Sequence, residues 1–221
     1  MFFHAQPLSK PEDVRQHLAK PDRHWRKGYS AMELATSWIE AGGFPGPVQA
    51  VLGRCPAYAG AELIEGLFEH QVDLGTRGRP SQTDLMVLAH VKVGYAVIAV
   101  EGKVEENFGP LISEWNDGSA GKLTRLNGLC ASLALDPAAV GGLRYQLLHR
   151  CVSALLEAQR YRAHQAMMLV HSFSRTDASL DDFTEFGAAM RIDGVAKDRV
   201  SDAKRIGSQE LRLAWVADRP S

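Results

Sequence analysis

The spacing of apolar residues changes near residue 70 of this 221-residue chain. Before that point apolar residues recur every three or four positions, which is typical of amphipathic helices. This spacing predicts helices over 9–19, from Ser30 to the Gly42–Gly43 pair, over 47–55 and over 60–70. After it, continuous apolar runs appear, and such runs are typical of strands that are covered on both faces.

Two of these runs, 84–91 and 95–103, are separated by only three residues, which predicts an antiparallel hairpin. The remaining elements predicted are a short strand over 71–75, helices over 122–135, 141–162 and 179–190, a buried strand over 164–173, and an edge or half-buried strand over 209–217. This order predicts an α/β fold with a mixed central sheet flanked by helices.

Composition narrows the functional classes. The chain is 45% hydrophobic and 23% charged, so it can bury a sizeable core, and its net charge of −1 argues against a protein that coats nucleic acid through bulk positive charge. The three cysteines lack the spacing of a metal site. We find neither a signal peptide nor an apolar run long enough to span a bilayer, so we expect a cytoplasmic protein without membrane contact.

Charged residues stand at the ends of the predicted hairpin. Glu101 and Lys103, two apart on one strand, point to the same face. A hairpin that turns at 92–94 places Asp84 opposite residue 102 or 103, and a shift of one residue decides which face Asp84 shares. On a common face, the two carboxylates would hold Mg²⁺ or Mn²⁺ for phosphodiester hydrolysis, with the lysine assisting. The alternative is a salt bridge that only caps the hairpin.

These residues resemble a known signature. Asp84, followed after sixteen residues by Glu101-Gly-Lys103, is similar to the Asp…(Asp/Glu)-x-Lys motif of the PD-(D/E)XK nuclease superfamily, although Thr83 stands where proline is usual. The predicted order of elements from 60 to 174 resembles that superfamily's core, and the whole chain resembles an uncharacterised bacterial branch of it. The resemblance implies a restriction-endonuclease-like core.

The resemblance also implies further site residues. In that superfamily the helix before the strands often supplies an extra metal-binding carboxylate, a role that falls to Glu65, with Glu62 as the alternative. A later helix often directs a glutamine or a basic residue at the site, which implies Gln146, with Arg144 or His149. Asp84, Glu101 and Glu65 are then the expected metal ligands.

The expected function is therefore Mg²⁺- or Mn²⁺-dependent hydrolysis of DNA. The alternatives are a catalytically inactive nuclease-fold module for binding or interaction, and a small-molecule enzyme. We expect 1–57 to form an N-terminal helical segment packed on a core of 58–221, and a homodimer is compatible with the sequence. Arg77 and Arg79 are candidates for contacts with a phosphate backbone, and Trp115 is a candidate for stacking on a base.

Overall fold

One mixed sheet organises the protein. The computed structural model describes residues 7–76 and 78–218. The strands run in the order β1-β2-β3-β4-β7-β5, and β6 also pairs with β7. They are β1 (Glu62–Val72), β2 (Ser81–His90), β3 (Tyr95–Lys103), β4 (Gln165–Ser172), β5 (Arg199–Val200), β6 (Lys204–Ile206) and β7 (Gln209–Ala217). Because β3, β4 and β7 are parallel and the other pairs are antiparallel, the predicted α/β class with a mixed sheet is confirmed.

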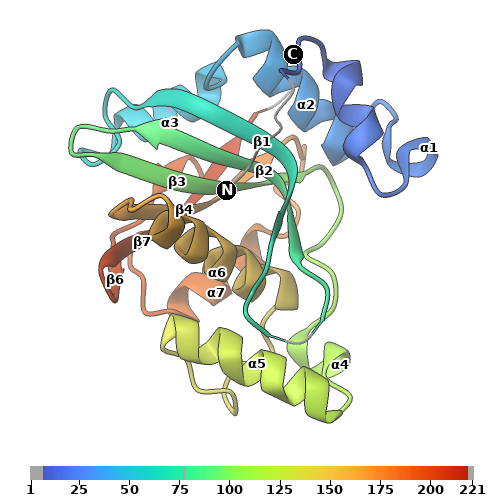
Figure 1. The fold of residues 1–221 in the computed structure, drawn as a ribbon, viewed down its shortest axis with the longest axis vertical. Helices are drawn as coiled ribbons and strands as arrows, with labels where there is room; N and C mark the ends of the chain where they lie inside the picture. The colour runs from blue at the N-terminus through green and yellow to red at the C-terminus, as the bar shows by residue number, and fades with distance from the viewer. Residues whose placement is uncertain (1–6, 77, 219–221) are drawn as a thin grey trace.

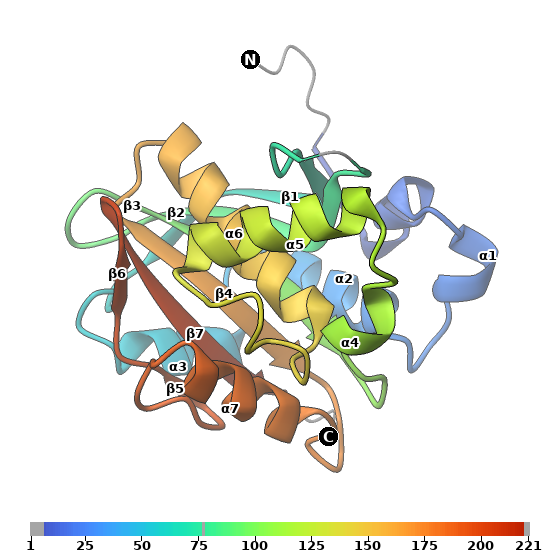
Figure 2. The ribbon, with the colours of Figure 1, turned by 90° about the horizontal axis from the view of Figure 1, so that it is seen from below.

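Helices cover both faces of this sheet (Figures 1 and 2). Side chains of α5 (Ala120–Leu133), α6 (Tyr145–Arg160) and α7 (Leu180–Ala189) share one apolar cluster with one face of the sheet. Those of α2 (Ser30–Ala41) and α3 (Gly46–Gly53) share a second cluster with the other face. The short elements η1 (Pro11–His17) and α1 (Pro21–His24) lie beside α2, and α4 (Ile112–Trp115) adds Ile112 to the first cluster. No helix in the described part of the chain is long and apolar enough to cross a membrane.

The hairpin of β2 and β3 forms as predicted, and its register is now defined. Val91 N–H donates to the carbonyl of Gly94, which has a φ of 76° that glycine adopts without strain. Leu85 pairs with Val100, and this register places Asp84 beside Glu101 rather than opposite residue 102 or 103. The side chains of β3 alternate between the two apolar clusters, because the strand is covered on both faces.

The predicted helix over 60–70 is wrong, because residues 62–70 belong to β1. Leu63, Leu67 and Phe68 have helical spacing, but a short apolar run fits either period, and the pairing partner decides between them. Here β1 pairs with β2 along almost its whole length, with one irregularity between Leu63 and Glu65. Residues 71 and 72 continue this strand, so the predicted short strand is the end of a longer one.

Smaller differences occur at both ends of the chain. The first predicted helix is a 3₁₀ helix, η1, that ends at His17. Strand β7 is flanked by β4 on one side and by β5 and β6 on the other, so it is not an edge strand of the described sheet. Its alternating residues Leu211, Leu213 and Trp215 are nevertheless buried, as the pattern predicted.

Candidate functional site

Asp84, Glu101 and Lys103 converge on the face of the sheet that carries α6. Glu101 and Lys103 follow Val97 and Ala99 on that face of β3, and both are almost completely buried, with 3% and 4% exposure. Asp84 Oδ2 accepts a hydrogen bond of 3.0 Å from the backbone N–H of Gly102. The side chain of Asp84 keeps 24% of its surface exposed. The register therefore brings the three residues together and leaves Asp84 accessible.

Each carboxylate oxygen of Glu101 has a partner. Lys103 Nζ donates to Oε1 at 3.2 Å, and Gln146 Nε2 donates to the same oxygen at 2.5 Å. Arg150 Nε donates to Oε2 at 2.5 Å. A buried carboxylate is stable only when such partners compensate for lost hydration, so these contacts explain how Glu101 can be charged here.

Lys103 is held from several directions. Its Nζ donates to Gln146 Oε1 at 3.1 Å and contacts the carbonyl of Asn107 at 3.4 Å. It also lies 4.9 Å from the centroid of the Phe108 ring, a cation–π distance. Gln146 thus bridges Lys103 and Glu101 from α6, which is the place that the sequence analysis gave it.

The sequence analysis missed Arg150, which lies one helical turn after Gln146 on α6. Besides its bond to Glu101, its Nη2 lies 3.9 Å from Asp84 Oδ1 and its Nη1 donates to Ser81 Oγ at 3.0 Å. Residues four apart on a helix share a face, so the position of Gln146 was a signal for Arg150. Of the two candidates named instead, Arg144 lies elsewhere, since it donates to Asp182 Oδ2 at 3.0 Å and to the carbonyl of Gly109. His149 lies beside the site, with its Nδ1 3.4 Å from Arg150 Nη1.

The expected auxiliary ligands Glu62 and Glu65 are not at the site, which corrects the prediction. Glu65 pairs with Leu88, four residues along β2 from Asp84, or about 13 Å at the rise of a strand. Glu62 is further away, opposite His90. The missed carboxylate is Glu69.

The pairs on either side of Glu69, Phe68 with Leu85 and His70 with Thr83, place it beside Asp84. Its Oε2 accepts a hydrogen bond from Gln82 Nε2.

Burial and neighbouring charges set the protonation of this cluster. Burial raises the pKa of Asp84 well above its ordinary value, and the nearby charge of Glu101 raises it further. Burial also raises the pKa of Glu69, to about 7. For Glu101, burial acts in the same direction, but Arg150 and Lys103 outweigh it and lower the pKa. The site therefore holds one firmly ionised carboxylate and two that protonate more readily.

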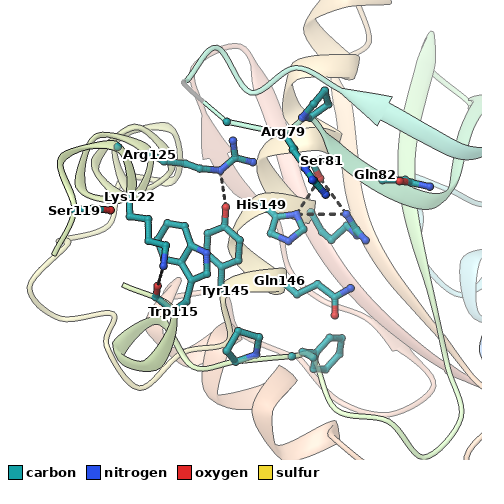
Figure 3. Close-up of a pocket in the computed structure, with 17 residues that line it drawn as sticks. Arg79, Ser81, Gln82, Trp115, Ser119, Lys122, Arg125, Tyr145, Gln146 and His149 are labelled. Carbon is teal, nitrogen blue, oxygen red and sulfur yellow. Dashed lines mark hydrogen bonds between the residues drawn. The ribbon is translucent and has the colours of Figure 1, made fainter. Parts of the chain in front are cut away.

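Two pockets flank this cluster. One is about 660 Å³ in volume and is lined by Glu69, Asp84, Glu101 and Lys103, with the segment from η1 to the start of α2 on its other side. The second is about 780 Å³ and is lined by Gln146, His149 and Arg150 together with α4, α5 and the loop before β2 (Figure 3). Gln82 lines both, so the two pockets meet at the candidate site.

Comparison with known proteins gives the family. Residues 7–220 match the sequence model of DUF6946, described as a domain of unknown function. The chain belongs to the DUF6946 family. No curated protein and no solved structure matches it. Inferences about the function of this DUF6946 chain therefore depend on the chemistry of the site.

The residues at the site fit a hard cation in part. Asp84, Glu101 and Glu69 offer only oxygen atoms, which suits Mg²⁺ or Mn²⁺ with water in the remaining positions. However, no group of three His, Cys, Asp or Glu residues in the described chain is arranged to hold a metal ion. The guanidinium of Arg150 contacts both Asp84 and Glu101, so it would compete with a cation for them.

Proposed function

We propose that this DUF6946 domain hydrolyses phosphodiester bonds of DNA with the help of Mg²⁺ or Mn²⁺. One observation carries the proposal: Asp84, Glu101 and Lys103 lie on one face, at one end of the sheet, beside an open pocket. A salt bridge that only caps the hairpin requires one carboxylate and one ammonium group. Here a second carboxylate, that of Asp84, is also present and faces the pocket. It also agrees with the resemblance to PD-(D/E)XK nucleases.

Each residue has a role in this proposal. Asp84 and Glu101 would hold the cation, which lowers the pKa of a bound water and balances charge on the phosphate. Lys103, fixed by Gln146 and the carbonyl of Asn107, would donate to a phosphate oxygen or orient the attacking water. The fixed orientation lowers the reorganisation needed during the reaction.

Glu69 takes the auxiliary place that the sequence analysis gave to Glu65. Burial raises its pKa to about 7, so at neutral pH it can either accept or donate a proton. It lines the same pocket as Asp84. We propose that Glu69 transfers a proton during hydrolysis or adds an oxygen ligand once it is ionised.

The second candidate is a nuclease-like module that binds nucleic acid without cleaving it. Arg150 favours this candidate, because its guanidinium already supplies a positive charge to Glu101 and Asp84. In that case the cluster of Asp84, Glu101, Lys103 and Arg150 would be a charge network that fixes the end of the sheet.

A cleavage assay separates the two candidates. Purified protein is incubated with single-stranded, duplex and branched DNA, with Mg²⁺, with Mn²⁺ or with EDTA. We expect metal-dependent cleavage that disappears in Asp84→Asn and Lys103→Ala but persists in Glu65→Gln, a matched carboxylate change outside the site. Absence of cleavage on every substrate with either metal would reject hydrolysis in favour of the binding module.

A further inference from the structure

The pocket beside α6, α5 and α4 is lined by four cationic side chains, Arg79, Lys122, Arg125 and Arg150, which we call the cationic pocket (Figure 3). None of its described lining residues is an aspartate or a glutamate. The net charge of the chain is −1, so this concentration of positive charge is local. Such a local excess of positive charge attracts anions.

Two of these cations have no carboxylate partner among residues 7–76 and 78–218. Lys122 pairs with Asp117 at 2.9 Å, and Arg150 pairs with Glu101. For Arg79 and Arg125, no salt bridge to a described carboxylate is found. Arg125 instead donates to the hydroxyl of Tyr145 at 2.6 Å, which fixes its direction without neutralising its charge. Arg77, also a candidate for phosphate contact, lies outside the described residues.

The lowered pKa of His149 agrees with a positive electrostatic potential in the cationic pocket. His149 lines the cationic pocket, and its Nδ1 contacts Ser81 Oγ at 2.9 Å. Burial lowers its pKa well below the ordinary value, and the charges of Arg150 and Arg125 lower it further. An anion in the pocket would therefore be bound by arginine and lysine, with His149 neutral.

The aromatic residues of the pocket point to phosphate as the recognised group. Trp115 and Tyr145 stack on each other, with ring centroids 4.0 Å apart and an interplanar angle of 12°. Lys122 also lies over the Trp115 ring at 5.5 Å. Because one face of the Trp115 ring already stacks on Tyr145, we do not expect stacking of Trp115 on a base to contribute most of the binding. The guanidinium groups, which match phosphate geometry, are the stronger recognition element.

The cationic pocket joins the candidate catalytic site directly. Gln146 and Arg150 line it and also bind Glu101, while Gln82 lines both pockets and donates to Glu69. Its volume of about 780 Å³ is that of a small-molecule site. One or two nucleotides of an unpaired strand would enter such a cavity, whereas the body of a duplex would not.

We propose that the cationic pocket binds phosphate groups of an unpaired nucleic-acid strand beside the candidate site, with Arg79 and Arg125 as the main contacts. The identity of the ligand rests on the proposed function, but binding does not require cleavage. Phosphates in the pocket would place the adjoining phosphodiester near Asp84 and Lys103.

The test measures binding in EDTA, so that it is independent of hydrolysis. A fluorescein-labelled single-stranded oligothymidylate is titrated with the protein, and anisotropy is followed at several salt concentrations. Three variants are compared: Arg79→Gln alone, a double variant that combines Arg79→Gln with Arg125→Gln, and Arg205→Gln as the control. Arg205 is an exposed arginine on β6, where its Nε bonds the carbonyl of Gly207. Thermal unfolding checks that each variant is folded.

We expect the double variant to bind at least ~10-fold more weakly than the unchanged protein. The slope of log affinity against log salt concentration should decrease in magnitude by ~1.4, which is about 0.7 for each lost phosphate contact. Arg79→Gln alone, an exposed change, should lose part of the affinity, and Arg205→Gln should match the unchanged protein. A blunt duplex should compete less well than the single strand. Equal affinity of the double variant and the control would overturn the pocket assignment, even if metal-dependent cleavage is found. Competition by the duplex that equals competition by the single strand would also overturn it. Binding that depends on the pocket, together with no cleavage in the assay with Mg²⁺ or Mn²⁺ described above, would support the pocket and reject hydrolysis.

Discussion

Replacing Arg150 with methionine tests how the charged site is held together. Methionine keeps much of the length and apolar stem of arginine but removes the guanidinium. Glu101 Oε2 then loses the donor at 2.5 Å, Asp84 loses its contact at 3.9 Å, and Ser81 Oγ loses the donor at 3.0 Å. Glu101 is only 3% exposed, so water cannot easily replace the lost partner.

Removing one partner of a buried ion pair costs about 3–5 kcal/mol in the free energy of unfolding. For a chain of this size, that corresponds to a melting temperature lower by roughly 10 °C. Arg150 is the largest of the influences that lower the pKa of Glu101, so the variant should take up a proton there more readily. The loss should therefore be smaller at pH 5 than at pH 7.5.

Urea denaturation followed by tryptophan fluorescence, at both pH values, measures this loss. Arg205→Met is the control, because Arg205 is exposed on β6, its Nε bonds only the carbonyl of Gly207 among the contacts found in residues 7–76 and 78–218, and its loss should cost less than about 1 kcal/mol. Millimolar Mg²⁺ should restore part of the stability of Arg150→Met, since a cation then has no competitor for Asp84 and Glu101. A loss below 1 kcal/mol at pH 7.5, or one that does not depend on pH, would refute the reasoning.

Three other changes test neighbouring parts of the account by the same unfolding assay. Burial raises the pKa of Glu69 from 4.5 to about 7, so the folded state loses stability as pH rises between these values. Glu69→Gln should therefore be more stable than the unchanged protein by up to ~3 kcal/mol above pH 7 and equally stable below pH 4.5. An equal gain at both pH values would contradict this reasoning. Trp38→Phe removes the donor to buried His171 Nδ1 at 3.0 Å and should cost about 1–3 kcal/mol, whereas no loss would show that this bond is unimportant. Gly102→Ala places a Cβ 3.3 Å from atoms of α2 and should cost about 1–3 kcal/mol, while Gly43→Ala, which meets open space, should be nearly neutral.

The sequence predicted those parts of the site that depend on local spacing. Glu101 and Lys103 lie two apart on one strand, and the short turn before Tyr95 makes the hairpin partner unambiguous. The face of Asp84 depended on a register that the sequence left open, because one residue of slip reverses every side chain. The structure places Asp84 beside Glu101.

The residues that the sequence missed depend on contacts between distant segments. Glu69 reaches the site only because 62–72 forms an edge strand paired with β2, and its local spacing also fitted a helix. Arg150 reaches it because α6 crosses the end of β3, which turns one side of that helix toward Glu101. The orientation of a helix relative to a sheet is a tertiary property, so only with Gln146 already placed at the site does the spacing of four residues favour Arg150 over Arg144.

The central claim, a cation held by Asp84 and Glu101, is tested most directly by Mn²⁺ binding, followed through the electron paramagnetic resonance signal of the free ion. The account predicts one Mn²⁺ bound per chain near pH 8 and weaker binding near pH 6, as Glu69, whose pKa burial raises to about 7, takes up a proton. It also predicts loss of this binding in Asp84→Asn but not in Glu65→Gln. No Mn²⁺ binding at either pH, or equal binding by Asp84→Asn, would contradict a metal site and leave the guanidinium of Arg150 as the positive group that contacts both carboxylates.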